Sequence, residues 1–561
     1  MADRPWLQHY PQDVDWNFAV KPAPIPCLLD EAAAEFGALP YIDFLGRRFT
    51  YGEIDAMASR AARGFQALGV KKGAKVGLFL SNCPQFIIAF FGILRAGGTV
   101  VNYSPLYSEQ ELQHQIEDSE TEIMVTLNTA TLYPKMAALL GKTCLRHLVI
   151  ANLPEVLPFV AGLGFRLFYR REVVPVAGDD RHTRFAGLLD NDGAYAPVDV
   201  DPVRDVAVLQ YTGGTTGVPK GAMLSHANIY LNVRQAALWD PETRRGAEKV
   251  IGVLPLFHAF AMTGTMLGSA ATGAEVLLYP RFDLDRLLKD ISCKKATILP
   301  AVPTMLMAII HHPHLRKYDL SSLRRVVSGG APLPGETKAR FEALSGSIIT
   351  EGYGLTEASP TASVSPLQGL HKEGSIGLPL PGTEIAIVDA EDSHRHLPLG
   401  EKGEIAVRGP QVMLGYWHNP EATAKTIVDG WLLTGDIGYM DKDGFTFIVD
   451  RKKDMILVSG FNVYPRMVEE AVYQHPAVRE VTVIGIPDPY HGETPKAFVV
   501  LKDGESLSPG ALRDFLKKRL GRHEMPSAIE FRQDLPKTMI GKLSKKELVA
   551  EEKARRDTGG E

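Results

Sequence analysis

The segment Tyr211–His226, YTGGTTGVPKGAMLSH, gathers glycines, threonines and one lysine into a short loop directly after an apolar run. That run, Asp205–Tyr211, is β-favouring and predicts a buried strand. Ser225 is a suitable N-cap for a helix that follows the loop. A strand, a Gly/Thr loop and a helix in this order gather backbone N–H groups around an anion. We therefore predict a phosphate site in this loop.

The length and composition of the chain predict a globular protein of at least two domains. At 561 residues it is too long for one hydrophobic core. Its 45% hydrophobic and 23% charged residues are typical of globular proteins. A net charge of -5 argues against nucleic-acid binding through bulk positive potential.

Cysteine usage and the absence of a long apolar segment indicate a cytoplasmic protein. The four cysteines lie far apart without zinc-type spacing, as expected for reduced thiols. The polar N-terminus is not a secretory signal. The apolar stretch Cys83–Leu94 is shorter than the roughly 20 residues that a membrane span needs, and it predicts a buried helix.

One segment, Leu157–Val174, mixes aromatic residues with arginines. It is either a peripheral contact with the inner face of the cytoplasmic membrane or a surface element packed on its own domain. The sequence leaves both alternatives open, and it does not decide whether the protein is a homodimer.

Alternating helical and strand-like segments in the first part of the chain predict a layered α/β architecture. The expected strands are Lys75–Leu80, Val206–Tyr211, Lys249–Leu254, Glu275–Leu278, Ala296–Leu299 and Arg325–Ser328. From about Gly382 the strands become short, alternating and glycine-punctuated, which indicates a small antiparallel sheet or β-barrel.

After Asp450 the pattern restarts, and it includes a helix from about Ser508. On one face of this helix lie Leu512, Phe515, Leu516 and Leu520. We predict an N-terminal domain of residues 1–449, with two α/β subdomains and a β-barrel. A smaller, mobile α+β C-terminal domain of residues 450–561 follows, with a hinge near Asp450.

The glycine loop is not a Walker A motif, because Pro219 precedes Lys220 and Gly221 follows it. It resembles the phosphate loop of the adenylate-forming superfamily, which includes acyl-CoA synthetases, adenylation domains and firefly luciferase. Four further segments resemble the family's acyl-pocket segment, adenine and metal segment, ribose site with hinge, and C-terminal lysine motif. In that order they are Leu254–Met262, Glu351–Pro360, Asp429–Pro465 and Pro536–Leu548.

The resemblance is strongest to bacterial long-chain fatty acyl-CoA ligases, on Leu80–Leu112 and the SGFNVYP motif at 459–465. It implies that a fatty acid and ATP give acyl-AMP and pyrophosphate, and that CoA then displaces AMP to give acyl-CoA. The first step brings two anions together, so cations and hydrogen-bond donors are needed.

The resemblance also assigns residues to the nucleotide, to Mg²⁺ and to CoA. The phosphates would be held by Thr212, Gly213, Gly214, Thr215, Thr216, Gly217 and Lys220. The adenine segments contribute Gly330, Ala331, Pro332, Glu351, Gly352, Tyr353, Gly354 and Thr356, and the ribose segment contributes Asp436, Ile448 and Arg451. Glu357 would carry Mg²⁺, a hard cation that prefers carboxylate oxygen, and Gly460 would line the CoA channel.

The implied catalytic residues are Thr212, His258, Glu357 and Lys542. Lys542 would enter the site during adenylation and contact carboxylate and phosphate oxygens. A unit charge about 4 Å from an anion is worth about 4 kcal/mol at an effective dielectric near 20. His258 would flank the acyl carboxylate, with a satisfied core histidine as the alternative.

Several other interpretations stay open on sequence alone. Lys220 and Glu357 could be ordinary surface residues, and Gly460 a turn glycine. A medium-chain or aryl acid-CoA ligase would use the same scaffold, and luciferase-like oxidation would use the same adenylate. A non-catalytic acyl-nucleotide or lipid-binding protein is the alternative from a different class, although it would be expected to have lost Glu357 or Lys542.

Overall fold

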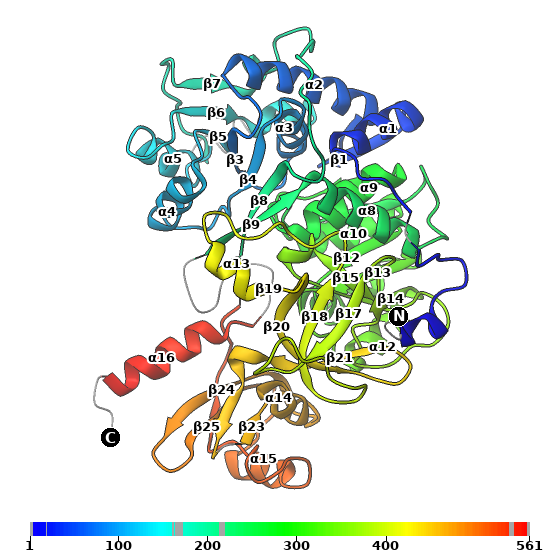
Figure 1. Ribbon diagram of the computed structural model, residues 1–561, viewed down its shortest axis with the longest axis vertical. Helices are drawn as coiled ribbons and strands as arrows, with labels where there is room; N and C mark the ends of the chain where they lie inside the picture. Colours follow the sequence, from blue (N-terminus) through cyan, green and yellow to red (C-terminus); the bar gives the residue numbers. More distant parts are fainter. Residues whose placement is uncertain are drawn as a thin grey trace.

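The computed structural model describes residues 4–17, 19–159, 162, 172–212, 219–459, 461–537 and 543–557. The glycine loop at 213–218, Gly460, Lys542 and most of Leu157–Val174 lie outside the described residues. Among the described residues the strands form four sheets (Figure 1). This layered α/β arrangement with a smaller C-terminal part agrees with the predicted fold class.

A seven-stranded sheet forms the end of the molecule drawn in blue and cyan in Figure 1. All neighbouring strands are parallel except the last pair. In spatial order the strands are β7 (His182–Arg184), β6 (His147–Ala151), β5 (Ile123–Leu127), β3 (Lys75–Phe79), β4 (Thr99–Asn102), β8 (Val206–Thr212) and β9 (Lys220–Ser225). Strand β5 is buried throughout, as a parallel strand covered on both faces requires.

Short helices surround this sheet, and one of them is buried along its whole length. They are α2 (Tyr51–Ala67), α3 (Pro84–Arg95), α4 (Glu109–Ser119), α5 (Tyr133–Leu139), α7 (Phe185–Leu188) and the 3₁₀ turn η2 (Leu153–Val156). Every residue of α3 is buried, which confirms the helix predicted from the apolar stretch Cys83–Leu94. No helix among the described residues is long and apolar enough to cross a bilayer.

A nine-stranded sheet occupies the centre of the chain, with six parallel strands and antiparallel strands at both edges. In spatial order the strands are β16 (Leu378–Pro379), β15 (Thr361–Val364), β14 (Ile348–Gly354), β13 (Arg325–Gly329), β12 (Ile298–Ala301), β10 (Lys249–Gly252), β11 (Glu275–Leu278), β1 (Pro40–Phe44) and β2 (Arg47–Thr50). The two large sheets share one continuous hydrophobic core, which runs from Trp6 to Phe445.

The helices that belong with the nine-stranded sheet include an eight-residue π-helix, η4 (Phe260–Leu267). The others are η1 (Pro5–His9), α1 (Pro26–Phe36), α8 (His226–Trp239), α9 (Gly268–Thr272), α10 (Leu284–Lys294), α11 (Pro303–Ile310), η5 (Leu315–Lys317), α12 (Gly335–Ser345) and η6 (Thr356–Ala358). Ser225 caps α8 by accepting a hydrogen bond from the Asn228 N–H, as predicted.

The order of elements after the glycine loop differs from the prediction. Strand β9 stands between the loop and α8, and it pairs with β8 so that Thr212 faces Lys220 across the hairpin. Strands β8 and β9, which precede and follow residues 213–218 in the chain, are thus antiparallel partners, and α8 begins only after β9. Any anion held there would depend on the loop's own N–H groups, threonines and Lys220 rather than on a helix dipole.

The third sheet has five antiparallel strands, as predicted from the glycine-punctuated segments after Gly382. The strands are β17 (Glu384–Val388), β18 (Gly403–Arg408), β19 (Ile427–Val428), β20 (Trp431–Met440) and β21 (Thr446–Arg451), and α13 (Pro420–Thr426) precedes β19. Its last strand leads directly into the C-terminal part of the chain.

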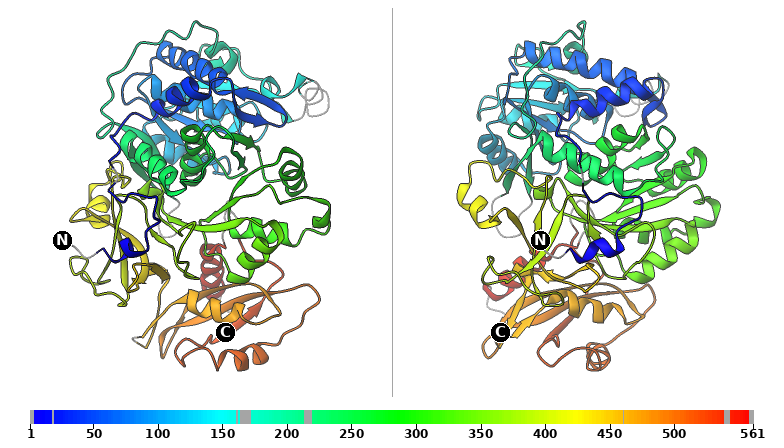
Figure 2. Two further views of the ribbon diagram at one scale, coloured as in Figure 1. Left: turned by 90° about the vertical axis from the view of Figure 1, so that its right-hand side faces the viewer. Right: turned by 45° about the vertical axis from the view of Figure 1, so that its right-hand side comes forward.

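The C-terminal part has its own sheet and two small hydrophobic cores. Its elements are η7 (Lys452–Asp454), β22 (Ile456–Val458), β23 (Phe461–Val463), α14 (Pro465–Tyr473), β24 (Val478–Asp488), β25 (Gly492–Leu501), α15 (Pro509–Leu516), β26 (Ala528–Phe531) and α16 (Lys545–Asp557). Figure 2 shows this part, in orange and red, at one end of the molecule in both views.

The helix predicted from Ser508 is shorter than expected. Ser508 caps it and Leu512 and Leu516 are buried, but the helix ends at Leu516. Leu520 lies beyond the helix and still packs against the C-terminal core. The boundary at Asp450 and the mobility of the C-terminal domain stay predictions.

Candidate active site

A cavity of about 260 Å³ lies between α8, the π-helix η4 and the nine-stranded sheet. At the carboxyl ends of β13 and β14 it is lined by Gly330, Gly352, Tyr353, Gly354 and Thr356. On the helical side it is lined by His258 and by much of Ala259–Gly268. The segments with predicted adenine and acyl roles therefore meet on one cavity, although about 70 residues separate them in the sequence.

Glycines keep the upper end of the cavity open. Gly330 follows β13 with φ +79°, a left-handed conformation that favours glycine. A Cβ on Gly354 would lie 2.1 Å from the Pro360 carbonyl oxygen, so no other residue fits there without a shift of the backbone. A Cβ on Gly329 would lie 3.2 Å from the Phe260 ring.

Tyr353, Asp436 and Arg451 form a connected polar group beside the cavity. The Tyr353 hydroxyl donates to Asp436 Oδ2 over 2.6 Å, and Arg451 Nε lies 3.1 Å from Asp436 Oδ1. Tyr353 and Asp436 are buried. Burial and the neighbouring Asp436 carboxylate raise the pKa of the Tyr353 hydroxyl well above its usual value, so this hydroxyl stays a donor. The group could accept hydrogen bonds from two hydroxyls of a sugar.

A second polar group lies where the strands flanking the glycine loop meet Tyr416. It contains Thr212 and Lys220 from those strands, and Glu357. The Tyr416 hydroxyl donates to Glu357 Oε1 over 2.8 Å, and Lys220 Nζ lies 5.0 Å from the centre of the Tyr416 ring. Thr212 Oγ1 donates to the Lys220 carbonyl over 3.5 Å. Tyr416 thus contacts an exposed lysine with its ring and a partly buried carboxylate with its hydroxyl.

Glu357 fits a magnesium ion that is held mainly by phosphate oxygens. Within the described ranges no cluster of three or more His, Cys, Asp or Glu side chains could hold a metal. Mg²⁺ commonly takes only one or two protein carboxylates and completes its shell with water and substrate phosphates. One oxygen of Glu357 accepts from Tyr416, and no side chain among the described residues hydrogen-bonds to the other oxygen.

The backbone before His258 is fixed by two buried amides. Asn82 donates to the Leu254 carbonyl over 2.9 Å and accepts from the Leu256 N–H over 2.8 Å. Gln210 donates to the Phe257 carbonyl over 2.9 Å. Burial lowers the pKa of the His258 imidazole, so it is neutral at pH 7. A neutral imidazole does not attract a carboxylate by charge, but it can position one by hydrogen bonding.

The remaining predicted residues lie at several places around this site. Ala331 and Pro332 follow Gly330 on the same loop, and Glu351 lies on β14, where burial raises the pKa of its carboxyl. Ile448 is partly buried on β21. Gly213, Gly214, Thr215, Thr216, Gly217, Gly460 and Lys542 fall outside the described residues.

Asp450 lies where β21 leaves the five-stranded sheet. Its Oδ2 accepts from the Arg466 N–H over 2.6 Å, and its Oδ1 accepts from the Arg451 N–H over 2.7 Å. Burial raises the pKa of the Asp450 carboxyl to about 6. Beside it, Lys545 Nζ lies 3.2 Å from Glu469 on α14, so this end of the lysine motif is anchored to α14.

Sequence reasoning missed Tyr416, the two amides Asn82 and Gln210, and the residues at the lower end of the cavity. Tyr416 is an ordinary tyrosine in a loop, and nothing near it in the sequence signals that it contacts Glu357. The amides belong to elements of the other sheet, and only the fold brings them to the backbone before His258.

The chain belongs to the AMP-binding enzyme family. The family model described as AMP-binding enzyme matches residues 29–417, and the model described as AMP-binding enzyme C-terminal domain matches residues 467–542. The cavity and the polar groups described above lie mostly within the first match.

The curated relatives of this enzyme span nearly its whole length. It is 42% identical over 554 residues to the long-chain-fatty-acid–CoA ligase of Bacillus subtilis, covering 98% of each chain. It is 40% identical over 564 residues to the enzyme of the same name from Escherichia coli O6:H1, covering 98% of this chain and 99% of that one.

Solved structures of other enzymes share the fold of this chain. The anthranilate CoA ligase AuaEII in complex with anthranoyl-AMP matches with a TM-score of 0.84 at 26% identity, covering 96% of this chain and 98% of that chain. ATP-bound MatB from Rhodopseudomonas palustris matches with a TM-score of 0.83 at 28% identity, and the match covers 96% of this chain and 100% of that chain.

Proposed function

We propose that this enzyme activates a fatty acid with ATP to acyl-AMP and pyrophosphate, and then forms acyl-CoA and AMP with CoA. The observation that carries the proposal is the single cavity that joins Tyr353 and Gly330 at its upper end to the apolar wall of η4. The identity of 42% to a long-chain-fatty-acid–CoA ligase supports the fatty acid as the substrate.

The two steps balance as displacements at phosphorus and at carbon. In the first, a carboxylate oxygen attacks the α-phosphorus of ATP, and the bond to pyrophosphate breaks. In the second, the thiol of CoA loses its proton and attacks the acyl carbon, and AMP leaves. The carboxylate alone is a poor acyl donor, because oxide is a poor leaving group, whereas AMP is a good one.

The described residues have distinct roles in this proposal. Asp436 and Arg451 hold the ribose, and Tyr353 forms one wall of the adenine pocket. Thr212 and Lys220 hold the phosphates at the mouth of the glycine loop, together with the loop itself. The neutral imidazole of His258 positions the carboxylate below the α-phosphate.

Mg²⁺ belongs to the proposal as the counterion of the triphosphate. Glu357 would hold it, and the ion would supply positive charge where the pyrophosphate leaves. Tyr416 orients the Glu357 carboxylate through its hydroxyl. Lys542, on the predicted mobile domain, would contribute a further positive charge during the first step only, and Gly460 would line the path of CoA in the second.

An aryl acid-CoA ligase is the second candidate, since AuaEII, an anthranilate CoA ligase, shares the fold. Against it stands the cavity's depth, because its lining extends from Tyr353 to residues at the opposite ends of the strands, Val250, Ile298 and Arg325. An aryl group would leave most of that length unfilled. A homodimer and a membrane contact through Leu157–Val174 stay predictions.

Pyrophosphate release from purified enzyme, ATP and Mg²⁺ tests the proposal. Fatty acids should give ATP-dependent release, and CoA should convert the product to acyl-CoA with one AMP per turnover. Benzoate and anthranilate serve as the comparison acids. If benzoate or anthranilate is turned over and none of the fatty acids is, the aryl candidate is favoured. If no acid gives pyrophosphate, both candidate functions are refuted.

A further inference from the structure

The cavity lies over several strands of the nine-stranded sheet, and along β13 its lining follows the whole strand. Side chains alternate between the two faces of a strand, and Arg325, Val327 and Gly329 are the three residues of β13 on the cavity face. They run from the amino end of β13 to its carboxyl end. Along β13 the side chains that line the cavity therefore become larger, from glycine at the nucleotide end to valine and then to arginine at the far end.

The far end is lined by residues that come from three different segments. They are Trp239 and Asp240 at the end of α8, Thr243 just after it, Arg325 at the start of β13, and Leu367 after β15. We refer to these five residues as the cavity floor.

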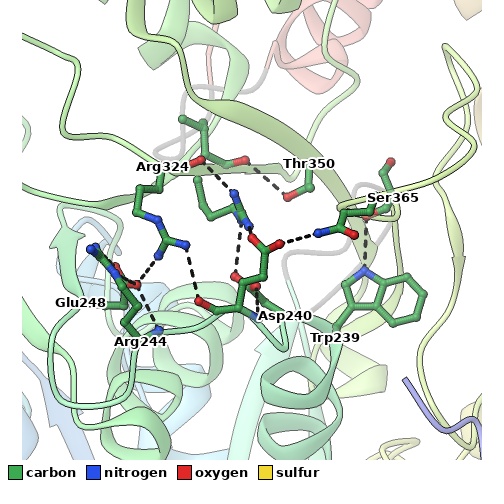
Figure 3. Close-up of polar contacts among 11 residues, drawn as sticks. Trp239, Asp240, Arg244, Glu248, Arg324, Thr350 and Ser365 are labelled. Carbon is green, nitrogen blue, oxygen red and sulfur yellow. Dashed lines mark hydrogen bonds and ion pairs between the residues drawn. The ribbon is translucent and has the colours of Figure 1, made fainter. Parts of the chain in front are cut away.

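Ion pairs and one indole hydrogen bond hold the floor together. Arg325 Nη2 lies 2.5 Å from Glu242 Oε2, and Arg325 Nε lies 3.5 Å from Asp240 Oδ2. Gln368 donates to the other oxygen of Glu242. The Trp239 indole N–H donates to the Ser365 carbonyl over 3.3 Å, and Figure 3 shows the indole pointing toward Ser365.

The ion-paired side of the floor reaches from the buried cavity toward solvent. The Arg325 side chain is 8% exposed, whereas its partner Glu242 is 46% exposed. Asp240 lies between these values at 20%. At Arg325 the cavity thus ends on a buried arginine whose outer partner, Glu242, is partly exposed to water.

We propose that the floor, with Arg325 as its central residue, sets the upper limit of acyl chain length in this enzyme. The inference rests on the proposed function and adds the residues that decide substrate length. An alkyl chain lying along β13 meets the guanidinium and its carboxylate partners. Pushing a methyl end into this group would separate the charges without replacing their interactions, which is unfavourable in a buried place.

The length of β13 gives the expected limit. Five residue steps from Arg325 to Gly330, at about 3.3 Å each, span about 16 Å. Carbon–carbon bonds of about 1.5 Å at a near-tetrahedral angle advance an extended chain about 1.25 Å per carbon. The cavity therefore accommodates about 13 carbons below the carboxyl group, and longer chains must displace the floor.

The test compares pyrophosphate release across saturated acids from octanoic to eicosanoic, with kcat/KM measured for each. We expect the wild-type profile to rise with length, by up to about fourfold per added methylene, and to fall once the chain passes the floor. Arg325→Ala should move that fall to acids at least two carbons longer. Val327 lies two residues nearer the nucleotide end of β13, so Val327→Phe should move that fall to shorter acids.

The control is Lys249→Ala, which removes a cation from the first residue of β10, a strand separated from β13 by β12. Lys249 Nζ lies 3.5 Å from Glu275, and alternation turns this side chain away from the cavity that Val250 lines. Its profile should match the wild type. Because each profile is a ratio within one variant, a general loss of activity or stability cancels.

The inference is overturned if Arg325→Ala and Val327→Phe both keep the wild-type chain-length profile. If wild-type enzyme releases no pyrophosphate with any acid, the proposed function fails instead. In that case, displacement of a fluorescent fatty acid by the same series of acids still tests the floor. Binding that weakens at the same chain length in wild type and in both cavity variants would refute it.

Discussion

Asp436 is held on both carboxylate oxygens before any substrate binds, by the Tyr353 hydroxyl and by Arg451. These partners fix the carboxylate and leave lone pairs for a ligand. Hydrogen bonds to a charged group contribute about 1.5–3 kcal/mol each, which is about ten- to a hundredfold in affinity. We therefore predict that Asp436→Asn raises the KM for ATP by about this factor and changes the KM for the fatty acid little, as measured by pyrophosphate release.

The control for Asp436 is Asp443→Asn, because Asp443 pairs with Lys372 and does not line the cavity. Equal effects of the two substitutions on the KM for ATP would remove the ribose role from Asp436.

Glu357 gives a second prediction at this scale, which concerns the metal. Glu357→Gln keeps the side-chain volume but removes the charge that a hard cation prefers. The Mg²⁺ concentration for half-maximal pyrophosphate release should rise by about tenfold or more. Tyr416→Phe removes only the hydrogen bond to Glu357 and should raise this concentration less. A Mg²⁺ dependence that Glu357→Gln leaves unchanged would contradict the assignment.

Local motifs predict individual functional residues well only where those residues are close together in the sequence. Gly330, Tyr353 and Thr356 lie in short segments that resemble the family's own, and the fold brings all three to one cavity. Arg325 and Trp239 lie at the opposite end of that cavity, and each looks like an ordinary strand or helix residue in the sequence. Their juxtaposition depends on the pairing of β13 with its neighbours, which no single segment specifies.

Helix α8 begins with a buried histidine that makes the enzyme sensitive to acid. His226 Nδ1 accepts from the Ile25 N–H over 3.2 Å, and burial lowers the pKa of the imidazole to about 4. The unfolded chain binds a proton near pH 6.5, whereas the folded chain does not until about pH 4. The free energy of unfolding should therefore fall by up to about 3 kcal/mol as the pH drops through this interval.

Substitution of His226 isolates this contribution. Urea unfolding at pH 7.5 and pH 5 should show that His226→Gln loses less stability on acidification than wild type, although it is less stable at pH 7.5. The exposed His114 on α4 gives the matched control, His114→Gln, which should keep the wild-type difference. An unchanged pH dependence in His226→Gln would refute the prediction.

Elements were predictable where one pattern dominated the segment. Apolar runs gave β3, β8 and β11 to within two residues at each end. Strand β9, KGAMLS, was missed because it mixes glycine, lysine and serine, and its pairing with β8 rather than its own composition makes it a strand. The Ser508 cap fixed the start of α15, but the chain turns after Leu516, so the apolar spacing to Leu520 overestimated the helix.

The two half-reactions make different demands on the whole molecule, and Lys542 distinguishes them. If the C-terminal domain brings this lysine to the site only for adenylation, Lys542→Ala should abolish acyl-AMP formation. The same variant should largely keep thioester formation from supplied acyl-AMP and CoA. Single-turnover assays of each step give the two rates. Equal losses in both steps would contradict the two-orientation mechanism.

Lys546→Ala is the control for Lys542, because Lys546 is an exposed lysine on the same segment. It should leave both steps near wild-type rates. Lys545 is not suitable, since it contacts Glu469 and its loss would release the segment from α14.

The pairing of Asp436 with Arg451 in β20 and β21 places the proposed ribose contact one residue from Asp450, the predicted hinge. No residue separates Arg451, which would contact ATP, from Asp450, about which the backbone would rotate. A torsional change at Asp450 must therefore pull on Arg451, and a nucleotide that immobilises Arg451 must resist that change. By reciprocity, each orientation of the C-terminal part would have its own affinity for ATP and for AMP. Release of AMP and rotation of the C-terminal part would therefore be energetically coupled.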